Sequence, residues 1–146
     1  MRRYQQRLAL TLAIILPVAG AGPGLAQDGD AERGERAFRK CQACHVVEQD
    51  GVNRAGPNLH GVLGRQAGVE EGFGFSPAMV TAGEEGLVWD EAALDHFIEQ
   101  PRAAVPGTKM AFAGIRNPQE RADIIAYLAT FPDEGAEGDG AATAGN

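Results

Sequence analysis

The chain has 146 residues, a formal net charge of −7 and two cysteines. This length is that of one domain, and two cysteines cannot form a disulfide-rich scaffold. The acidic balance argues against nucleic acid, because phosphates require a basic surface, and against adhesion to an anionic membrane.

The first 26 residues have the pattern of a secretory signal peptide that is cleaved. Three arginines precede the apolar run Leu8–Ala19, and Gly24 and Ala26 place small residues ahead of a cut before Gln27. An uncleaved anchor is the alternative, but the run is well short of the ~20 residues of a spanning helix, so we expect no stable membrane insertion. Losing the three arginines takes the charge from −7 to −10, and export predicts a periplasmic protein.

The first predicted element is a helix from about Ala31 to about His45, capped by Asp30. Its apolar stripe has spacings of three and four and consists of Gly34, Ala37, Phe38, Cys41 and Cys44. Glycine on such a stripe costs helix stability. Its presence indicates that a second helix approaches closely at Gly34.

The end of this helix carries Cys41-Gln42-Ala43-Cys44-His45, which is the C-x-x-C-H pattern of c-type haem attachment. Two thiols three residues apart can reach two vinyl groups on one edge of a porphyrin, with the histidine facing the iron. A thioredoxin-like pair would need a βαβ setting, and structural zinc about four ligands. We therefore expect one covalent haem c, with a thioredoxin-like pair, a structural zinc site and chance occurrence as the alternatives.

From Val46 to Gly74 the apolar periodicity fails, and repeated glycines predict a long irregular segment. A segment of this length needs something to pack against, and a haem would provide it. Ser76 and Pro77 can start a short helical turn through Val80. The stretch 81–86 is predicted to be a surface loop.

Two further helices are predicted. Asp90 caps the first, whose buried stripe is Leu94, Phe97 and Ile98 and which Pro101 ends. The second starts at Asn117 and Pro118, with Glu120 at the third position, and its apolar residues are Ile124, Ile125, Tyr127 and Leu128. Residues 133–146 are predicted to be a disordered acidic, Gly/Ala-rich tail, which leaves 27–132 as the domain.

Four side chains are candidates for the iron position opposite His45: His60, His96, Met79 and Met110. Met110 lies in an extended Pro-Gly-Thr-Lys-Met loop that can place a thioether against a flat ring. Met79 is expected in the core, His96 on the surface because it is off the apolar stripe, and His60 in a structural or exposed position.

These motifs together resemble the class I c-type cytochromes, in the group of bacterial cytochrome c2 and mitochondrial cytochrome c. The resemblance runs in order through the segments 34–45, 56–65, Trp89, 106–115 and 124–128. It implies an all-α fold, with three main helices and long loops wrapped around one covalently bound haem.

The resemblance also implies a role for each matching residue. Cys41 and Cys44 would carry the thioethers, and His45 and Met110 would bind the iron. The carbonyl of Pro57 would accept a hydrogen bond from His45, while Arg65 and Trp89 would address a propionate. Thr108 would remain near the ligating sulfur, Phe112 would cover the haem face, and Gly34 and Phe38 would meet Ile124 and Tyr127.

Phe75, Met79 and Phe97 depart from mitochondrial members, which usually carry tyrosine, asparagine and tyrosine there. Losing a hydroxyl donor to the sulfur lowers the reduction potential, whereas a more apolar pocket raises it, so the two effects oppose. Our hypothesis is that the smaller polar network makes Met110 harder to displace at high pH.

The expected function is that of a soluble, monomeric, periplasmic one-electron carrier and not an enzyme. Its redox partners would dock at a haem edge surrounded, by resemblance, with Lys40, Arg54, Arg102, Lys109 and Arg116. The alternatives are a haem subunit of a larger dehydrogenase or oxidase complex, and a haem peroxidase or gas-binding protein, which would need an open iron position.

Overall fold

The computed structural model describes residues 28–133. The predicted signal peptide and the tail beyond Asp133 lie outside the described residues. Within them the chain forms helices α1 (Ala31–Phe38), α2 (Pro77–Glu84), α3 (Glu91–Glu99), α4 (Pro101–Ala104) and α5 (Pro118–Leu128). The described part has no strand, only the isolated bridge Gln66–Val88. The all-α prediction is confirmed.

Each predicted cap is present. The side chains of Asp30, Ser76 and Asp90 each accept a hydrogen bond from the backbone N–H three residues on, and Asn117 accepts from Gln119 and Glu120. These bonds satisfy amides that have no partner inside the helix. Local sequence therefore determines where these four helices begin.

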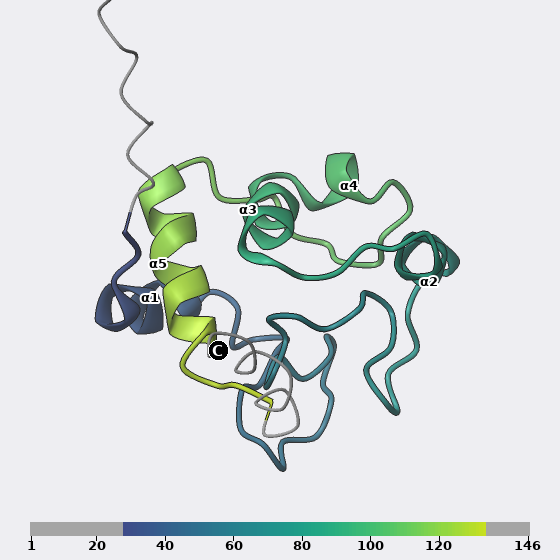
Figure 1. Cartoon of the computed structure of the whole chain (residues 1–146), viewed down its shortest axis with the longest axis horizontal. Helices are drawn as coiled ribbons and strands as arrows, with labels where there is room; N and C mark the ends of the chain where they lie inside the picture. Colours follow the sequence, from purple (N-terminus) through teal and green to yellow (C-terminus); the bar gives the residue numbers. More distant parts are fainter. Residues whose placement is uncertain (1–27, 134–146) are drawn as a thin grey trace, which may run out of the picture.

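Helix α1 crosses α5 at one side of the molecule, α3 lies beside α5, α4 lies beside α3, and α2 lies at the far side (Figure 1). At the crossing, a Cβ on Gly34 would lie 1.9 Å from the backbone oxygen of Asp123. The rings of Phe38 and Tyr127 lie 5.3 Å apart. The predicted close approach is confirmed, because only glycine allows the two backbones this contact.

Ion pairing also joins the two helices. The buried carboxylate of Asp123 accepts hydrogen bonds from Arg33 at 2.8 and 3.0 Å and from the backbone of Asp30 at 2.8 Å. The hydrogen bonds from Arg33 hold the pKa of Asp123 well below its ordinary range, against the opposing effect of burial. The sequence reasoning missed this residue because nothing local marks it as buried.

Two predicted boundaries were wrong. Helix α1 ends at Phe38, and turns follow through Cys44 instead of helix to His45. A three-residue spacing suits such turns as well as helix, so the stripe could not place the end. Helix α2 continues to Glu84, through the predicted loop. Its last turn packs closely on Ala67, which Gly83 allows: a Cβ at position 83 would lie 1.9 Å from the backbone oxygen of Ala67.

Pro101 ends α3 as predicted. It also begins the one-turn helix α4, which the sequence did not predict, because proline is tolerated at a first helical position. The core lies between the helices and the loop 46–75. Its buried members are Phe38, Val47, Val62, Ala67, Met79, Trp89, Leu94, Phe97, Val105, Ile115, Ile124, Ile125 and Leu128.

Candidate haem site

The C-x-x-C-H pentapeptide occupies the turns that follow α1. The amide of Cys44 donates to the oxygen of Cys41 at 3.0 Å, and the amide of His45 donates to the same oxygen at 2.9 Å. Neither cysteine forms a disulfide, and Cys41 is half-buried against the core whereas Cys44 is exposed. Burial raises the pKa of the Cys41 thiol to about 11, an effect that Lys40 opposes.

The ring of His45 is held in one orientation. Its Nδ1 lies 2.8 Å from the carbonyl oxygen of Pro57. A carbonyl only accepts, so Nδ1 carries the proton and the Nε2 lone pair is left for a metal. Gly56 packs on the ring, where a Cβ would lie 2.4 Å from Cε1. Burial lowers the pKa of His45, which favours this neutral form, and the Pro57 bond opposes the shift.

Met110 is half-buried and packs against the core. Its backbone N–H donates to Thr108 Oγ1 at 3.3 Å, so the hydroxyl of Thr108 serves the turn of this segment. The ammonium of Lys109 donates to the carbonyl of Gly74 at 2.8 Å, which attaches the segment to the long loop. Phe112 is half-buried two residues further on.

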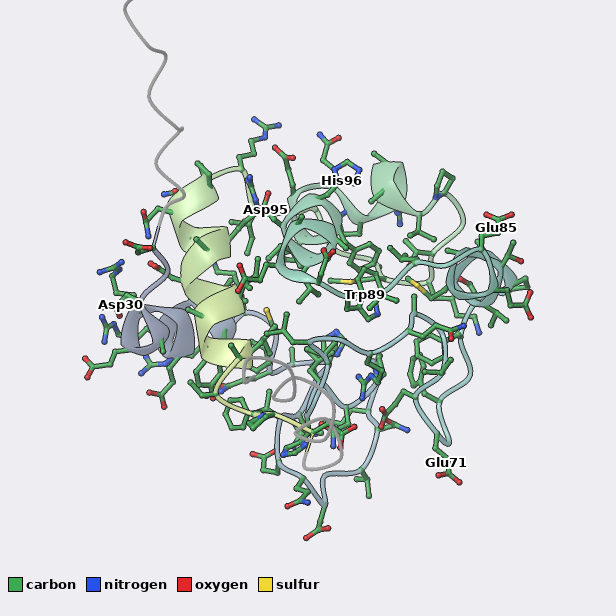
Figure 2. All side chains as sticks on the ribbon, viewed as in Figure 1. Asp30, Glu71, Glu85, Trp89, Asp95 and His96 are labelled. Atoms are coloured by element: carbon green, nitrogen blue, oxygen red, sulfur yellow. The ribbon has the colours of Figure 1, made fainter. Side chains whose placement is uncertain are left out.

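Arg65 and Trp89, which are predicted to address a propionate, lie in different settings. Arg65 donates to the carbonyls of Asn58 at 2.8 Å and His60 at 3.1 Å, and it pairs with Glu70. Trp89 is buried at the centre of the molecule (Figure 2), its ring 4.9 Å from that of Phe97. Their propionate role stays a prediction.

The other candidate ligands have the positions that the sequence predicted. Met79 is 6% exposed in the core, and His96 is exposed on the outer side of α3 (Figure 2). His60 is half-buried, its ring 6.4 Å from that of Phe131. Of the four candidates for the iron position opposite His45, Met110 is therefore the one whose thioether is half-buried in an extended segment.

The five predicted basic residues are all exposed, but three have partners. Lys40 pairs with Glu120 on α5, Arg54 donates to the carbonyl of Gln42 at 3.2 Å, and Lys109 donates to Gly74. Arg102 lies at the start of α4, and Arg116 precedes α5. A cavity of about 440 Å³ is lined by residues that include Arg102 and Phe112, and neither cysteine is among them.

Sequence reasoning missed one structural residue of the site. Asn58 is 4% exposed, and its amide donates to the carbonyls of Glu48 and Gly51, both at 2.9 Å. It therefore fixes the loop that carries Pro57 to His45. A buried asparagine has no local signature, since its partners come from loop residues seven and ten positions away.

The alternative interpretations of the cysteine pair are not supported. Residues 28–133 contain no group of three or more Cys, His, Asp or Glu side chains that could hold a metal, as zinc would require. The absence of strands in the same range leaves no βαβ unit for a thioredoxin-like pair. A thiol pair beside a histidine with a free Nε2 fits a covalently bound haem.

No helix in the described range is long and apolar enough to span a membrane.

Comparisons with known proteins agree with this chemistry. The cytochrome c family model matches residues 31–132. Cytochrome c2 of Rhodomicrobium vannielii is 49% identical over 102 residues, covering 70% of this chain and 79% of that protein. The structure of cytochrome cH from Methylobacterium extorquens has a TM-score of 0.62 at 48% identity, covering 70% of this chain and 99% of that one. Cytochrome c2 from Rhodospirillum centenum has a TM-score of 0.68 at 39% identity, with 72% and 100% covered.

The fold and the thiol pair beside His45 define a c-type cytochrome of class I. The chain belongs to the cytochrome c family, and its similar proteins include several cytochromes c2. It carries a single covalently attached haem c and is an electron carrier.

Proposed function

We propose that the protein is a soluble periplasmic one-electron carrier whose haem c is attached through Cys41 and Cys44 and bound by His45 and Met110. The observation that carries this proposal is the 2.8 Å contact between Nδ1 of His45 and the carbonyl of Pro57. It leaves Nε2 as the ring nitrogen available to a metal, in the residue that directly follows Cys44.

The chain's contribution is to hold two ligands and to exclude water. The haem supplies the one-electron ferric/ferrous couple, with a comparatively high potential under His/Met ligation. Phe97, Trp89 and Met79 make the interior apolar, and each is under 9% exposed. An apolar interior disfavours the extra charge of the ferric state. With His45 and Met110 both holding the iron, no residue would have a catalytic role, and the protein would not act as an enzyme.

Export to the periplasm rests on the sequence pattern of residues 1–26, which is that of a cleaved signal peptide. We propose a monomer because the length of the chain is that of a single domain. The signal is tested by the N-terminus of the protein purified from the periplasm, which we expect at Gln27. Recovery of the intact Met1 chain in membranes would contradict it.

The proposed docking surface for redox partners is the exposed basic set Lys40, Arg54, Arg102, Lys109 and Arg116. Lys40 forms an ion pair with Glu120, which offsets its charge. We therefore assign most of the attraction for a redox partner to Arg102 and Arg116. The partner is expected to present carboxylates, since charge complementarity steers encounter.

Two matched substitutions test the ligand assignment. Met110→Leu should remove the weak red absorption band of an iron–thioether bond and let the ferrous protein bind carbon monoxide. Met79→Leu, the same change in a buried core methionine, should do neither. A band that survives Met110→Leu but not Met79→Leu would assign the ligand to Met79.

The wild type distinguishes the remaining alternatives. Rapid carbon monoxide binding to the unaltered ferrous protein would favour a gas-binding protein or peroxidase, because both need an open iron position. Elution of the native protein only at the size of a larger complex would favour a subunit of a dehydrogenase or oxidase over a free carrier.

A further inference from the structure

The segment from Met110 to Asn117 has no helical hydrogen bonds of its own, so other elements must hold it. The amide of Ile115 donates to the carbonyl of Ile98 on α3 at 2.9 Å. Gly114, with φ of +91°, lies against the end of the same helix, where a Cβ would be 1.9 Å from the oxygen of Glu99. The segment that carries Met110 is thus seated on α3.

Arg121 of α5 attaches the segment a second time. Its Nη1 donates to the carbonyls of Ile115 at 3.0 Å and Arg116 at 3.1 Å. The same guanidinium binds both oxygens of Asp95 on α3, Nε to Oδ1 at 2.7 Å and Nη2 to Oδ2 at 3.1 Å. One side chain therefore joins α3, α5 and the Met110 segment.

Asp95 determines where this guanidinium points. The side chain of Arg121 is 7% exposed, and a buried cation needs a counter-charge as well as neutral acceptors. A bidentate carboxylate supplies that charge and fixes the plane of the fork, which directs Nη1 at the two carbonyls. Glu99, with Oε1 at 3.8 Å from Nη1, adds negative charge but is too far for a hydrogen bond, so it does not fix the plane of the fork. Asp95 lies on the side of α3 that faces α5 (Figure 2).

We propose that Asp95 is a positioning residue for the sixth iron ligand: through Arg121 it holds the Met110–Asn117 segment closed against α3. The inference rests on the proposed ligation by Met110. Without the carboxylate, Arg121 reorients toward solvent, its bonds to Ile115 and Arg116 weaken, and the segment opens more often.

Added imidazole measures this opening at constant pH. It binds the ferric iron only when Met110 has left, so its apparent affinity is proportional to the open fraction. Loss of one partner of a fully buried pair would change this fraction about a hundredfold or more. Asp95 is 39% exposed, and water replaces part of the pairing. We therefore expect Asp95→Asn to bind imidazole about tenfold more tightly than the wild type.

The matched control is Asp123→Asn, which removes the carboxylate from the other arginine–aspartate pair of α5, in which the carboxylate is buried and Arg33 is exposed. Asp123 binds Arg33, Asp30 and Gln119, none of them in the Met110 segment. It should lower overall stability while imidazole affinity stays within about threefold of the wild type. Exchange of the Ile115 amide, which should accelerate in Asp95→Asn only, reports the opening without using the iron.

The outcomes separate the two proposals. A wild type without the iron–thioether band would overturn ligation by Met110, and this inference with it. A band that is present, with equal imidazole affinities in Asp95→Asn and Asp123→Asn, would overturn this inference alone. If Asp95→Asn does not acquire haem, Arg121→Lys replaces it, because lysine keeps the charge but lacks the fork. The same tightening is then expected, and wild-type affinity would overturn the inference.

Discussion

The contact between α1 and α5 allows the most direct test of the fold, by Gly34→Ala. The added Cβ would lie 1.9 Å from the oxygen of Asp123 and 2.7 Å from the Cβ of Tyr127, whereas ordinary contact begins at 3.4 Å. The helices would have to separate by about 1.5 Å, and neither backbone can rotate away as a flexible side chain could. Separation would also loosen the Phe38–Tyr127 ring contact.

Two effects of this substitution oppose each other. Alanine should favour the helix by about 1 kcal/mol, while overpacking of this kind costs about 3 kcal/mol, so we expect a net loss of about 2 kcal/mol. Guanidinium denaturation followed by the fluorescence of Trp89, the single tryptophan, gives this quantity as a lower midpoint at unchanged slope. Glu35→Ala, at an exposed position of α1, is the control and should change stability by under about 0.5 kcal/mol. A Gly34→Ala protein as stable as the wild type would refute the close approach.

Three further predictions follow from charge and burial. The guanidinium of Arg33 on α1 depresses the pKa of Asp123 in the folded state. The stability that Asp123 contributes is therefore complete above about pH 4, the pKa of the unfolded state, and is lost as the pH falls below that value. Asp123→Asn should flatten the acid side of a plot of thermal midpoint against pH, and an unchanged slope would contradict this. Phe97→Tyr adds a hydroxyl to a side chain that is 7% exposed, and we expect the iron–thioether absorption band to disappear at lower pH than in the wild type. A band that persists to the same pH would count against the hypothesis that the smaller polar network makes Met110 harder to displace. Association with an acidic redox partner should slow as the salt concentration rises. Arg102→Gln should reduce this dependence of the rate on salt, whereas Arg36→Gln on α1 should not. Rates independent of salt in the wild type would rule out electrostatic docking.

Local chemistry explains why much of the fold could be predicted. A capping side chain acts on amides two or three residues away, so Asp30, Ser76, Asp90 and Asn117 identify helix starts without knowledge of the rest of the chain. Helix ends were less accessible. The end of α1 and the extension of α2 depend on contacts with other segments, such as the approach of Gly83 to Ala67.

Buried charge was the main feature that sequence reasoning could not find. Arg121 and Asp123 are both under 7% exposed, although charged residues on a helix usually face solvent. Their partners are 26 and 90 residues away, Asp95 and Arg33. No periodicity within α5 records a partner at that separation, because the compensation exists only after the helices have packed.

The sequence alone determined the chemistry of the cofactor, because Cys41, Cys44 and His45 are neighbours in the chain and need only one turn to meet one haem edge. The tertiary structure decided how the two proposed ligands, His45 and Met110, are held. Pro57 selects the tautomer of His45 across twelve residues, and Arg121 with Asp95 secures the segment of Met110. Each is a directional hydrogen bond between distant segments, so it depends on the packed positions of the backbones and not on any local pattern.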